Sequence, residues 1–386
     1  MRTWIVRALV ACCAVGLVAA LAACGSTSSA SSGSTSASGG SSSDASSGGG
    51  AAVFAAAKRE IANLSKIQPA EPLPPLSGKV PAGKTVAVIN CTLPTCTPAA
   101  DTAPFKALGW HLKLFPFDLT KGPSDAIRAL NAAIATHPDY ILFKDLFPMP
   151  PFAPSLAEAA KQHIPVVQVA GNSGTANTIG CVNCQPEYIR VGRVLTDMAL
   201  ADAGTKTGIA FVCDQNYIPL QQLNAGFEEA AAEAKSTGTT FTKVNVDITQ
   251  PPGQTAQTVV DFLQRNPSTK YVIACIPETA LALPQAIAQA GLSNKVKLIY
   301  ASPEPAQLDA IKAGQLFGAV AEESAASHWR AADLLARLAV GDKIPQALRD
   351  PVGWIQVVDQ QNADHIAPSL DPPDYQQTFE KVWGVS

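Results

Sequence analysis

Short apolar runs recur along the chain between residues 85 and 301, and segments with apolar residues at helical spacing separate them. Several runs are continuously apolar, which is typical of strands buried on both faces of a parallel sheet. The runs predict these strands: Thr85–Asn90, Leu112–Phe117, Tyr140–Phe143, Val166–Ala170, Ile209–Cys213, Phe241–Val246, Tyr271–Ile276 and Val296–Ala301. Strands that alternate with helices predict βαβ units with right-handed crossovers.

About four such units precede residue 180 and about four follow it, so each half has the size of a doubly wound parallel sheet. The predicted fold class is α/β, with two lobes in series. Ligands of open α/β sheets bind beyond the carboxyl ends of the strands. Two such sheets that face each other across a hinge predict a cleft that closes around a small molecule.

The N-terminus has the pattern of an export signal. Arg2 and Arg7 precede an apolar stretch from Ala8 to Ala23, which is shorter than the ~20 residues that a spanning helix needs. The stretch ends in Leu-Ala-Ala-Cys at Cys24 and resembles a bacterial lipobox, in which Cys24 becomes the lipidated first residue. We therefore expect residues 1–23 to be a signal peptide. Lipidated Cys24 would anchor the exported protein to the outer face of the bacterial cytoplasmic membrane.

The segment that follows predicts a tether and a lead-in to the folded body. Residues 24–50 are rich in Ser and Gly and behave as a flexible coil. Residues 51–66 have apolar positions at helical spacing, and a run of prolines up to Pro81 then forbids regular structure. Residues 51–78 are thus read as an amphipathic helix and a proline-rich lead-in.

Several motifs resemble those of sugar-type periplasmic binding proteins. His137–Leu142 and His163–Val167 resemble the "hPDaIll" and "gIPVv" patterns of the first lobe. Asn224–Phe227, Pro277–Ala282 and Ala313–Ala321 resemble second-lobe motifs in the same order. The resemblance covers roughly residues 84–358. It implies a type I, ribose-binding-protein-like substrate-binding lipoprotein of an ABC importer.

This resemblance implies a division of the chain and a function. The N-terminal lobe would hold residues 79–185 and 322–350, and the C-terminal lobe residues 186–321 and 351–386. A three-segment hinge would lie near 184–186, 321–323 and 350–353. The protein would be a monomeric receptor, not an enzyme, that delivers a small molecule to ABC transporter permease subunits. A sensory or sugar-binding receptor of the same fold is an alternative, and a secreted hydrolase that uses Glu187 or Glu322 is a more remote one.

The polar groups that clamp sugar hydroxyls in the ribose-binding type are largely missing. Ala170 stands where that type has an Asp, Leu223 where it has an Arg, and Ile276 and Pro277 where it has Asn and Asp. A buried site without donors and acceptors cannot compensate desolvated hydroxyls. We therefore expect a ligand less polar than a simple sugar, such as a carboxylated apolar compound.

Candidate ligand-binding residues follow the predicted strands. Lys144 is the candidate partner of a ligand carboxylate, although Asp145 or Glu322 is an alternative partner. Glu322 stands where the family has a Gln. For each polar candidate the alternative role is that of a helix cap that does not contact a ligand. The candidates are Thr92, Thr95, Lys144, Asp145, Phe147, Asn172, Glu187, Gln215, Tyr217, Glu278, Ser302 and Glu322.

Six cysteines remain after Cys12, Cys13 and Cys24 are set aside, and they allow 15 pairings. Cys91 and Cys96 would pin the loop after the first strand, and Cys181 and Cys184 the start of the second lobe. Cys213 and Cys275 end strands that are neighbours in a 2-1-3 order, and an oxidising exterior favours their pairing. The alternatives are a zinc site built from the first four thiolates and a redox role for Cys181–Cys184.

Composition excludes other classes. The chain has 386 residues with 28 Lys+Arg against 31 Asp+Glu, so it lacks the basic excess that a nucleic-acid binder needs. Five scattered histidines do not predict a metal site. Residues Gly78–Thr85 match the sequence motif of a phosphate-binding loop. Such a loop follows a strand and begins a helix, whereas here a proline run precedes the motif and a strand follows it, so we do not expect phosphate binding. We expect no cofactor and no metal.

Overall fold

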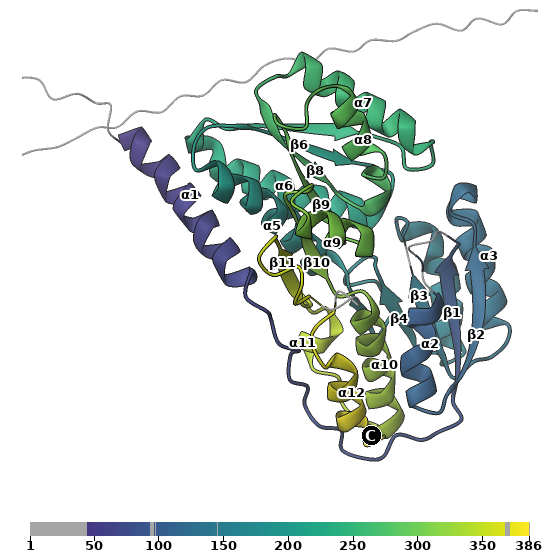
Figure 1. Ribbon diagram of the computed structural model, residues 1–386. Coiled ribbons are helices and arrows are strands. Elements are labelled where there is room, and N and C mark those ends of the chain that lie inside the picture. The colour runs from purple at the N-terminus through teal and green to yellow at the C-terminus, as the bar shows by residue number, and fades with distance from the viewer. Residues whose placement is uncertain (1–44, 93–95, 97, 145, 367–370, 386) are drawn as a thin grey trace, which may run out of the picture. The chain divides into compact units, whose positions relative to one another are not determined.

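Two separate β-sheets with flanking helices organise the chain (Figure 1). The computed structural model describes residues 45–92, 96, 98–144, 146–366 and 371–385. The predicted signal peptide, Cys24 and most of the tether lie outside these residues. No helix within them is long and apolar enough to cross a membrane.

The first sheet has the order β2-β1-β3-β4-β5, and all neighbouring strands are parallel. Its central strands are buried, whereas the edge strand β2 is largely exposed. The strands are β1 (Thr85–Cys91), β2 (His111–Phe117), β3 (Tyr140–Lys144), β4 (Val166–Val169) and β5 (Gly180–Val182). The helical segments of this lobe are α2 (Pro98–Ala107), η1 (Leu119–Lys121), α3 (Pro123–Ile134), η2 (Pro150–Phe152) and α4 (Ala153–Lys161).

The second sheet has the order β11-β10-β9-β8-β6-β7, and only the β10–β11 pair is antiparallel. Its strands are β6 (Gly208–Cys213), β7 (Thr240–Asn245), β8 (Thr269–Ala274), β9 (Lys297–Ala301), β10 (Gly318–Glu322) and β11 (Ile355–Val358). The accompanying helical segments are α5 (Gln185–Ala203), α6 (Ile218–Glu233), η3 (Ala234–Thr237), α7 (Pro252–Arg265), η4 (Pro277–Thr279), α8 (Leu283–Gln289) and α9 (Pro305–Lys312).

All eight predicted strands are strands of the structure, with ends that agree within two residues. The predicted α/β class with two doubly wound sheets is confirmed. The strands that the sequence did not predict are β5, β10 and β11. They are three to five residues long, and β10 contains Gly and Ala, so their local hydrophobic signal is weak.

Helices α5 and α6 pack closely because glycines lie at their contact. A Cβ atom on Gly192 would collide with the backbone carbonyl of Leu223, and one on Gly226 would collide with that of Ile189. Helix packing therefore accounts for Gly226 in the motif Asn224–Phe227, and no role in ligand binding is needed to explain it.

The chain passes between the two lobes at three places. It leaves β5 for α5 through Asn183 and Cys184, leaves β10 for α10 (Ala325–Val340) through Glu323 and Ser324, and returns from α11 (Gln346–Arg349) to β11. Helix α10 packs on α2, β4 and β5 of the first lobe, and α11 contacts β5. These crossings lie at or next to the three predicted hinge segments.

Residues 45–81, here called the N-terminal strap, contact both lobes. Helix α1 (Ala45–Leu64) packs against α5 and η3 of the second lobe, with an ion pair between Glu60 and Arg190 (Figure 1). The chain beyond α1 lacks regular structure. The Pro74 carbonyl accepts a 2.7 Å hydrogen bond from Arg337 of α10. The strap is thus a further link between the lobes, and its helix begins earlier than the predicted residue 51.

The C-terminal helix α12 (Tyr375–Trp383) packs on α10. Trp383 stacks on Trp329 with ring centroids 5.3 Å apart, and its indole N–H donates to Asp333 at 2.9 Å. The sequence assigned residues 351–386 as a whole to the C-terminal lobe. In the structure β11 joins the second sheet, whereas α12 contacts the first-lobe helix α10.

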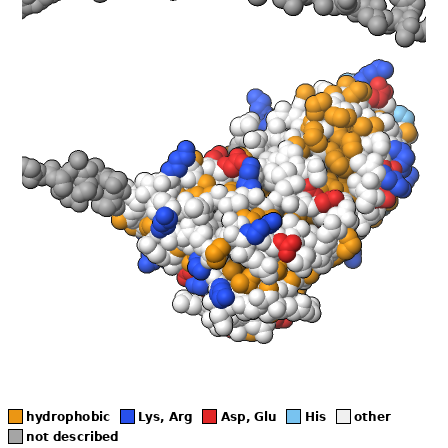
Figure 2. Space-filling view, turned by 90° about the horizontal axis from the view of Figure 1, so that it is seen from above, with side chains coloured by type: hydrophobic (Ala, Val, Ile, Leu, Met, Phe, Trp, Pro, Cys, Tyr) orange, Lys and Arg blue, Asp and Glu red, His pale blue; other side chains and the backbone are white. Residues whose placement is uncertain are grey.

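Charged side chains of both signs are scattered over the face drawn in Figure 2, with apolar side chains between them. This face presents no continuous basic surface, in keeping with the formal net charge of -3.

Candidate functional site

A cavity of about 490 Å³ lies between the two lobes, at the carboxyl ends of strands from both sheets. The first lobe contributes residues at and after the ends of β3 and β4, including Lys144, Leu146 and Ala170. The second lobe contributes the start of α6 and the segments that follow β8 and β9. Because parallel strands end at one edge of a sheet, segments distant in sequence meet here.

The two lobes touch directly at one side of the cavity. The backbone N–H of Ile218 donates to the Leu146 carbonyl at 3.1 Å, and the Gln222 amide donates to the Gly171 carbonyl at 3.2 Å. The rings of Phe147 and Tyr217 lie 6.0 Å apart. These contacts bring the walls together, so a small molecule in the cavity would be enclosed from two sides.

The walls of the cavity are mostly apolar. Ala170 directly follows β4 and lines the cavity. Leu223 is buried in α6 and does not line the cavity. The apolar lining residues include Leu119, Leu146, Val169, Ala170, Leu220, Ile248, Ile276 and Pro277.

Glu322 ends β10 and is the most unusual polar group of the lining. One carboxyl oxygen, Oε1, accepts a hydrogen bond from the Ser302 hydroxyl. The other, Oε2, is buried and has no hydrogen-bond partner among the described residues. Burial raises the pKa of Glu322 to about 7, against the opposing effect of the Ser302 hydrogen bond. The carboxyl group therefore titrates near neutral pH.

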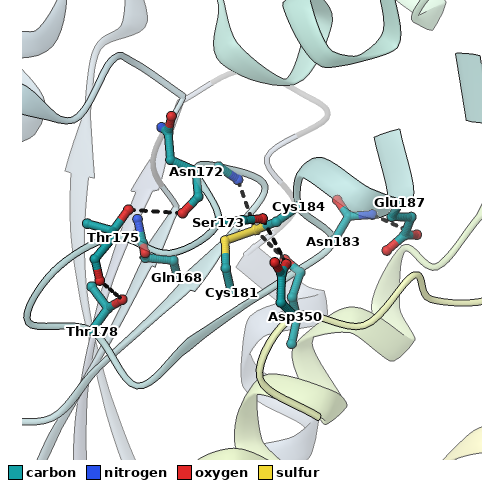
Figure 3. The surroundings of a disulfide bond; sticks show 12 residues. Gln168, Asn172, Ser173, Thr175, Thr178, Cys181, Asn183, Cys184, Glu187 and Asp350 are labelled. Atoms are coloured by element: carbon teal, nitrogen blue, oxygen red, sulfur yellow. Dashed lines mark hydrogen bonds between the residues drawn. A yellow bond between two sulfur atoms is a disulfide. The ribbon is translucent and has the colours of Figure 1, made fainter. Parts of the chain in front are cut away.

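A network of buried polar side chains joins the crossing segments beside the cavity, and Figure 3 shows its hydrogen bond between Asn183 and Glu187. Asn183 donates to Glu187 Oε1 at 3.0 Å and accepts a hydrogen bond from the Tyr188 hydroxyl at 2.6 Å. Glu323 accepts two hydrogen bonds from Arg330, at 2.6 and 2.7 Å, and one from the Trp354 backbone at 3.1 Å. The Asn183 amide also donates to the Glu323 carbonyl at 3.4 Å, so all three crossings are tied together.

Glu187 is the least solvated acid of this network, with 0% of its surface exposed. Burial, and then the nearby charges of Glu323 and Glu322, raise its pKa well above the ordinary value. Its Oε2 atom has no hydrogen-bond partner in the described part of the chain. Glu187 therefore belongs to the hinge and does not line the cavity.

The cavity brings together five of the predicted site residues: Lys144, Tyr217, Glu278, Ser302 and Glu322. Thr95 and Asp145 lie outside the described residues. The remaining candidates do not line the cavity: Thr92, Phe147, Asn172, Glu187 and Gln215.

Local bonding explains where these other candidates lie. The Thr92 backbone N–H bonds to the Phe117 carbonyl, and the Asn172 amide donates to the Phe147 carbonyl at 3.2 Å. Phe147 packs between Phe117 and Tyr217. The Gln215 backbone N–H is held by the Asn245 side chain. These groups shape the loops around the cavity.

The structure adds lining residues that the sequence did not single out. Asn183 and Glu323 come from the crossings, Glu304 from the start of α9, and Ser327 and His328 from α10. Strand ends alone could not indicate the last two, because α10 follows a crossing back to the first lobe. The position of His328 just after a crossing is the only sequence signal that could have found it.

The six cysteines meet in the three favoured pairs. The Cα atoms of Cys91 and Cys96 are 5.6 Å apart, those of Cys181 and Cys184 5.9 Å, and those of Cys213 and Cys275 5.4 Å. All three distances are compatible with disulfides. The first pair borders the cavity through Cys96, the second lies at the crossing into α5 (Figure 3), and the third links β6 to the end of β8.

Comparisons with known proteins agree with this architecture. The model of a periplasmic binding protein domain matches residues 104–343. A search of curated proteins found no match.

Solved structures show the same fold at low sequence identity. A periplasmic ribose ABC transporter protein from Conexibacter woesei is 17% identical, with a TM-score of 0.64 over 75% of this chain and 96% of that one. A 5-methylthioribose transporter solute binding protein from Thermotoga lettingae is 17% identical, with a TM-score of 0.65 over 80% and 95%. A glucose-galactose binding protein from Geobacillus stearothermophilus is 17% identical, with a TM-score of 0.62 over 73% and 99%.

The matched domain covers well over half of the chain, and the two doubly wound lobes, three crossings and interlobe cavity are the architecture that the sequence resemblance implied. The chain belongs to the periplasmic binding protein domain family.

Proposed function

We propose that this protein is an extracytoplasmic solute-binding protein that captures a small molecule between its lobes and delivers it to the permease of an ABC transporter. The observation that carries this proposal is the cavity of about 490 Å³ with walls from both lobes. Ligand contacts to both walls favour the closed arrangement, so binding would shift the population of lobe positions. A permease can then distinguish loaded from empty protein by shape.

The ligand we propose is a compact molecule less polar than a simple sugar. Apolar side chains dominate the walls, and Ala170 leaves one side of the cavity without a hydroxyl-binding group. The similar protein from Thermotoga lettingae was solved with 5-methylthioribose, a ribose derivative with an apolar substituent. A buried hydroxyl without a partner costs free energy, so such a cavity disfavours fully hydroxylated ligands.

Lys144 lines the cavity, as a carboxylated ligand would require. The same cavity is lined by Glu278, Glu304 and Glu322, which would repel a ligand carboxylate. Lys144 alone therefore does not decide the charge of the ligand.

The export signal supports an extracytoplasmic location, and lipidation at Cys24 would hold the protein at the membrane. The Ser/Gly-rich tether would leave the folded body free to turn toward a permease. Incorporation of labelled palmitate into the wild-type protein, lost in Cys24→Ala, is the expected result. Equal labelling of both proteins would contradict anchoring at Cys24.

Native mass spectrometry of the purified protein without residues 1–44 tests the capture of a solute. We expect a bound small molecule that is released on unfolding. Small-angle X-ray scattering before and after its removal should show an increase in the radius of gyration. An empty protein whose scattering no added solute changes would contradict the proposal.

A further inference from the structure

The cavity carries an excess of acidic groups. Of its described lining residues, four bear a carboxyl group, and the groups that can carry positive charge are Lys144 and His328. The acids are Glu278, Glu304, Glu322 and Glu323.

Glu323 and Glu322 differ in how their charges are compensated. Glu323 forms a two-pronged ion pair with Arg330, at 2.6 and 2.7 Å, so its charge is already compensated. Glu322 accepts a hydrogen bond only from neutral Ser302, and its Oε2 atom is buried without a partner among described residues. A buried polar atom in this state costs free energy until a donor reaches it.

The cavity that Glu322 lines suits a cation with an apolar body. Tyr188 and Tyr217 line the same cavity, and aromatic faces attract cations. The remaining wall is mainly aliphatic. An ammonium group would supply both the missing donor and the missing positive charge. A neutral hydroxyl would supply only the donor, and a carboxylate neither.

We propose that the ligand is a small organic amine with an apolar body, whose ammonium group binds the Glu322 carboxylate. This inference rests on the proposed function, since it names the ligand class of the same cavity. It also replaces the carboxylated ligand that Lys144 suggested in the sequence.

Matched probes test the proposal: phenethylamine, phenethyl alcohol and hydrocinnamate share an aromatic body but carry an ammonium, a hydroxyl and a carboxylate group. Isothermal titration of the protein without residues 1–44 should rank the amine first, by at least about tenfold over both others. In Glu322→Gln this preference should fall to about twofold, while binding of the alcohol persists. The matched control is Glu158→Gln, an exposed acid outside the cavity lining, where we expect less than about a twofold change because solvent screens its charge.

The pH dependence gives a second readout. Amine affinity should rise severalfold from pH 5.5 to pH 8 as Glu322 loses its proton, and alcohol affinity should stay flat. Other titratable or charged groups lie around the crossings and the cavity, and Glu322→Gln keeps all of them, so the difference between the two proteins isolates Glu322. These groups are Glu187, Glu323 and Arg330 around the crossings, and Lys144, Tyr188, Tyr217, Glu278, Glu304 and His328 around the cavity.

Failure of this inference and failure of the proposed function give different results. If the alcohol or hydrocinnamate binds as tightly as the amine, or if the released natural ligand has no basic group, the amine class is wrong and solute binding stands. If none of the three probes binds and no natural ligand is released, both proposals fail.

Discussion

Glu322 lines the cavity, and its burial there disfavours the charged form of its carboxyl group. Burial raises the pKa of this group to about 7 from an ordinary value of 4.5. The Glu322 carboxyl group therefore loses its proton less readily in the folded protein than in the unfolded chain. Stability that Glu322 contributes at low pH is lost as the pH rises through about 7.

The first prediction follows from this loss of stability with rising pH. Glu322→Gln should leave the stability of the ligand-free protein nearly unchanged at pH 4.5. At pH 8 it should raise the free energy of unfolding by up to about 3 kcal/mol relative to wild type, because ~1.4 kcal/mol corresponds to each pKa unit. Urea unfolding at the two pH values measures the difference. Glu304→Gln is the control, and an equal gain there would contradict the assignment to Glu322.

Gly353 supports the second prediction, at the crossing into β11. Its backbone has φ of +77°, and a Cβ atom would collide with the carboxylate of fully buried Glu187. Gly353→Ala should lower the free energy of unfolding by about 2–3 kcal/mol, because the cost of backbone strain and the cost of displacing the buried Glu187 side chain are summed.

Gly341→Ala is the matched control for Gly353→Ala. Gly341 has φ of +83° with open space around its Cβ position, so only the strain of about 1 kcal/mol applies. Urea unfolding measures both variants. Equal losses would show that the contact with Glu187 has no influence.

At the scale of elements, the N-terminal strap supplies the third prediction. Gln356 of β11 is fully buried, and its side chain accepts from the Gln68 backbone N–H at 2.9 Å and donates to the Leu64 carbonyl at 2.5 Å. Gln356→Leu would leave both backbone groups unpaired. We expect a loss of about 1–3 kcal/mol and faster hydrogen exchange in residues 62–70.

Gln361→Leu, on the exposed turn after β11, is the control for the strap. It should change neither stability nor exchange in residues 62–70. Unchanged exchange in Gln356→Leu would mean that the other contacts of the strap, such as the packing of α1 on α5 and the bond from Arg337 to Pro74, hold it without Gln356.

At the scale of the whole molecule, the disulfides supply the fourth prediction. Cys213 and Cys275 are 62 residues apart in the sequence, whereas Cys181 and Cys184 are 3 apart. A cross-link that closes a longer loop restricts the unfolded chain more. By that entropy, replacing Cys213 and Cys275 together by Ala should cost about 4 kcal/mol, and replacing Cys181 and Cys184 about 2 kcal/mol. Chemical unfolding under oxidising conditions measures both, and the reverse order would contradict loop closure as the main cause.

Most of the fold could be predicted from the sequence because the relevant signals are local. Continuous apolar runs indicated the central strands, and helical spacing indicated the main helices. Strands β6 and β8 are neighbours, as in the 2-1-3 order for which the pairing of Cys213 with Cys275 was favoured. The short strands β5, β10 and β11 escaped because a few residues carry little periodicity.

The amino-acid sequence alone was sufficient for the α/β class, the two lobes and the strand ends that bring Lys144 and Glu278 to the cavity, whereas Glu322 was identified through the resemblance to the family. Folding buries Glu187 at the crossings, brings α12 onto α10 and leaves one oxygen of Glu322 without a partner among the described residues. These features depend on burial and on contacts between segments far apart in the chain. A local pattern specifies where a strand ends, whereas the charge that a side chain can hold is set by everything that packs around it.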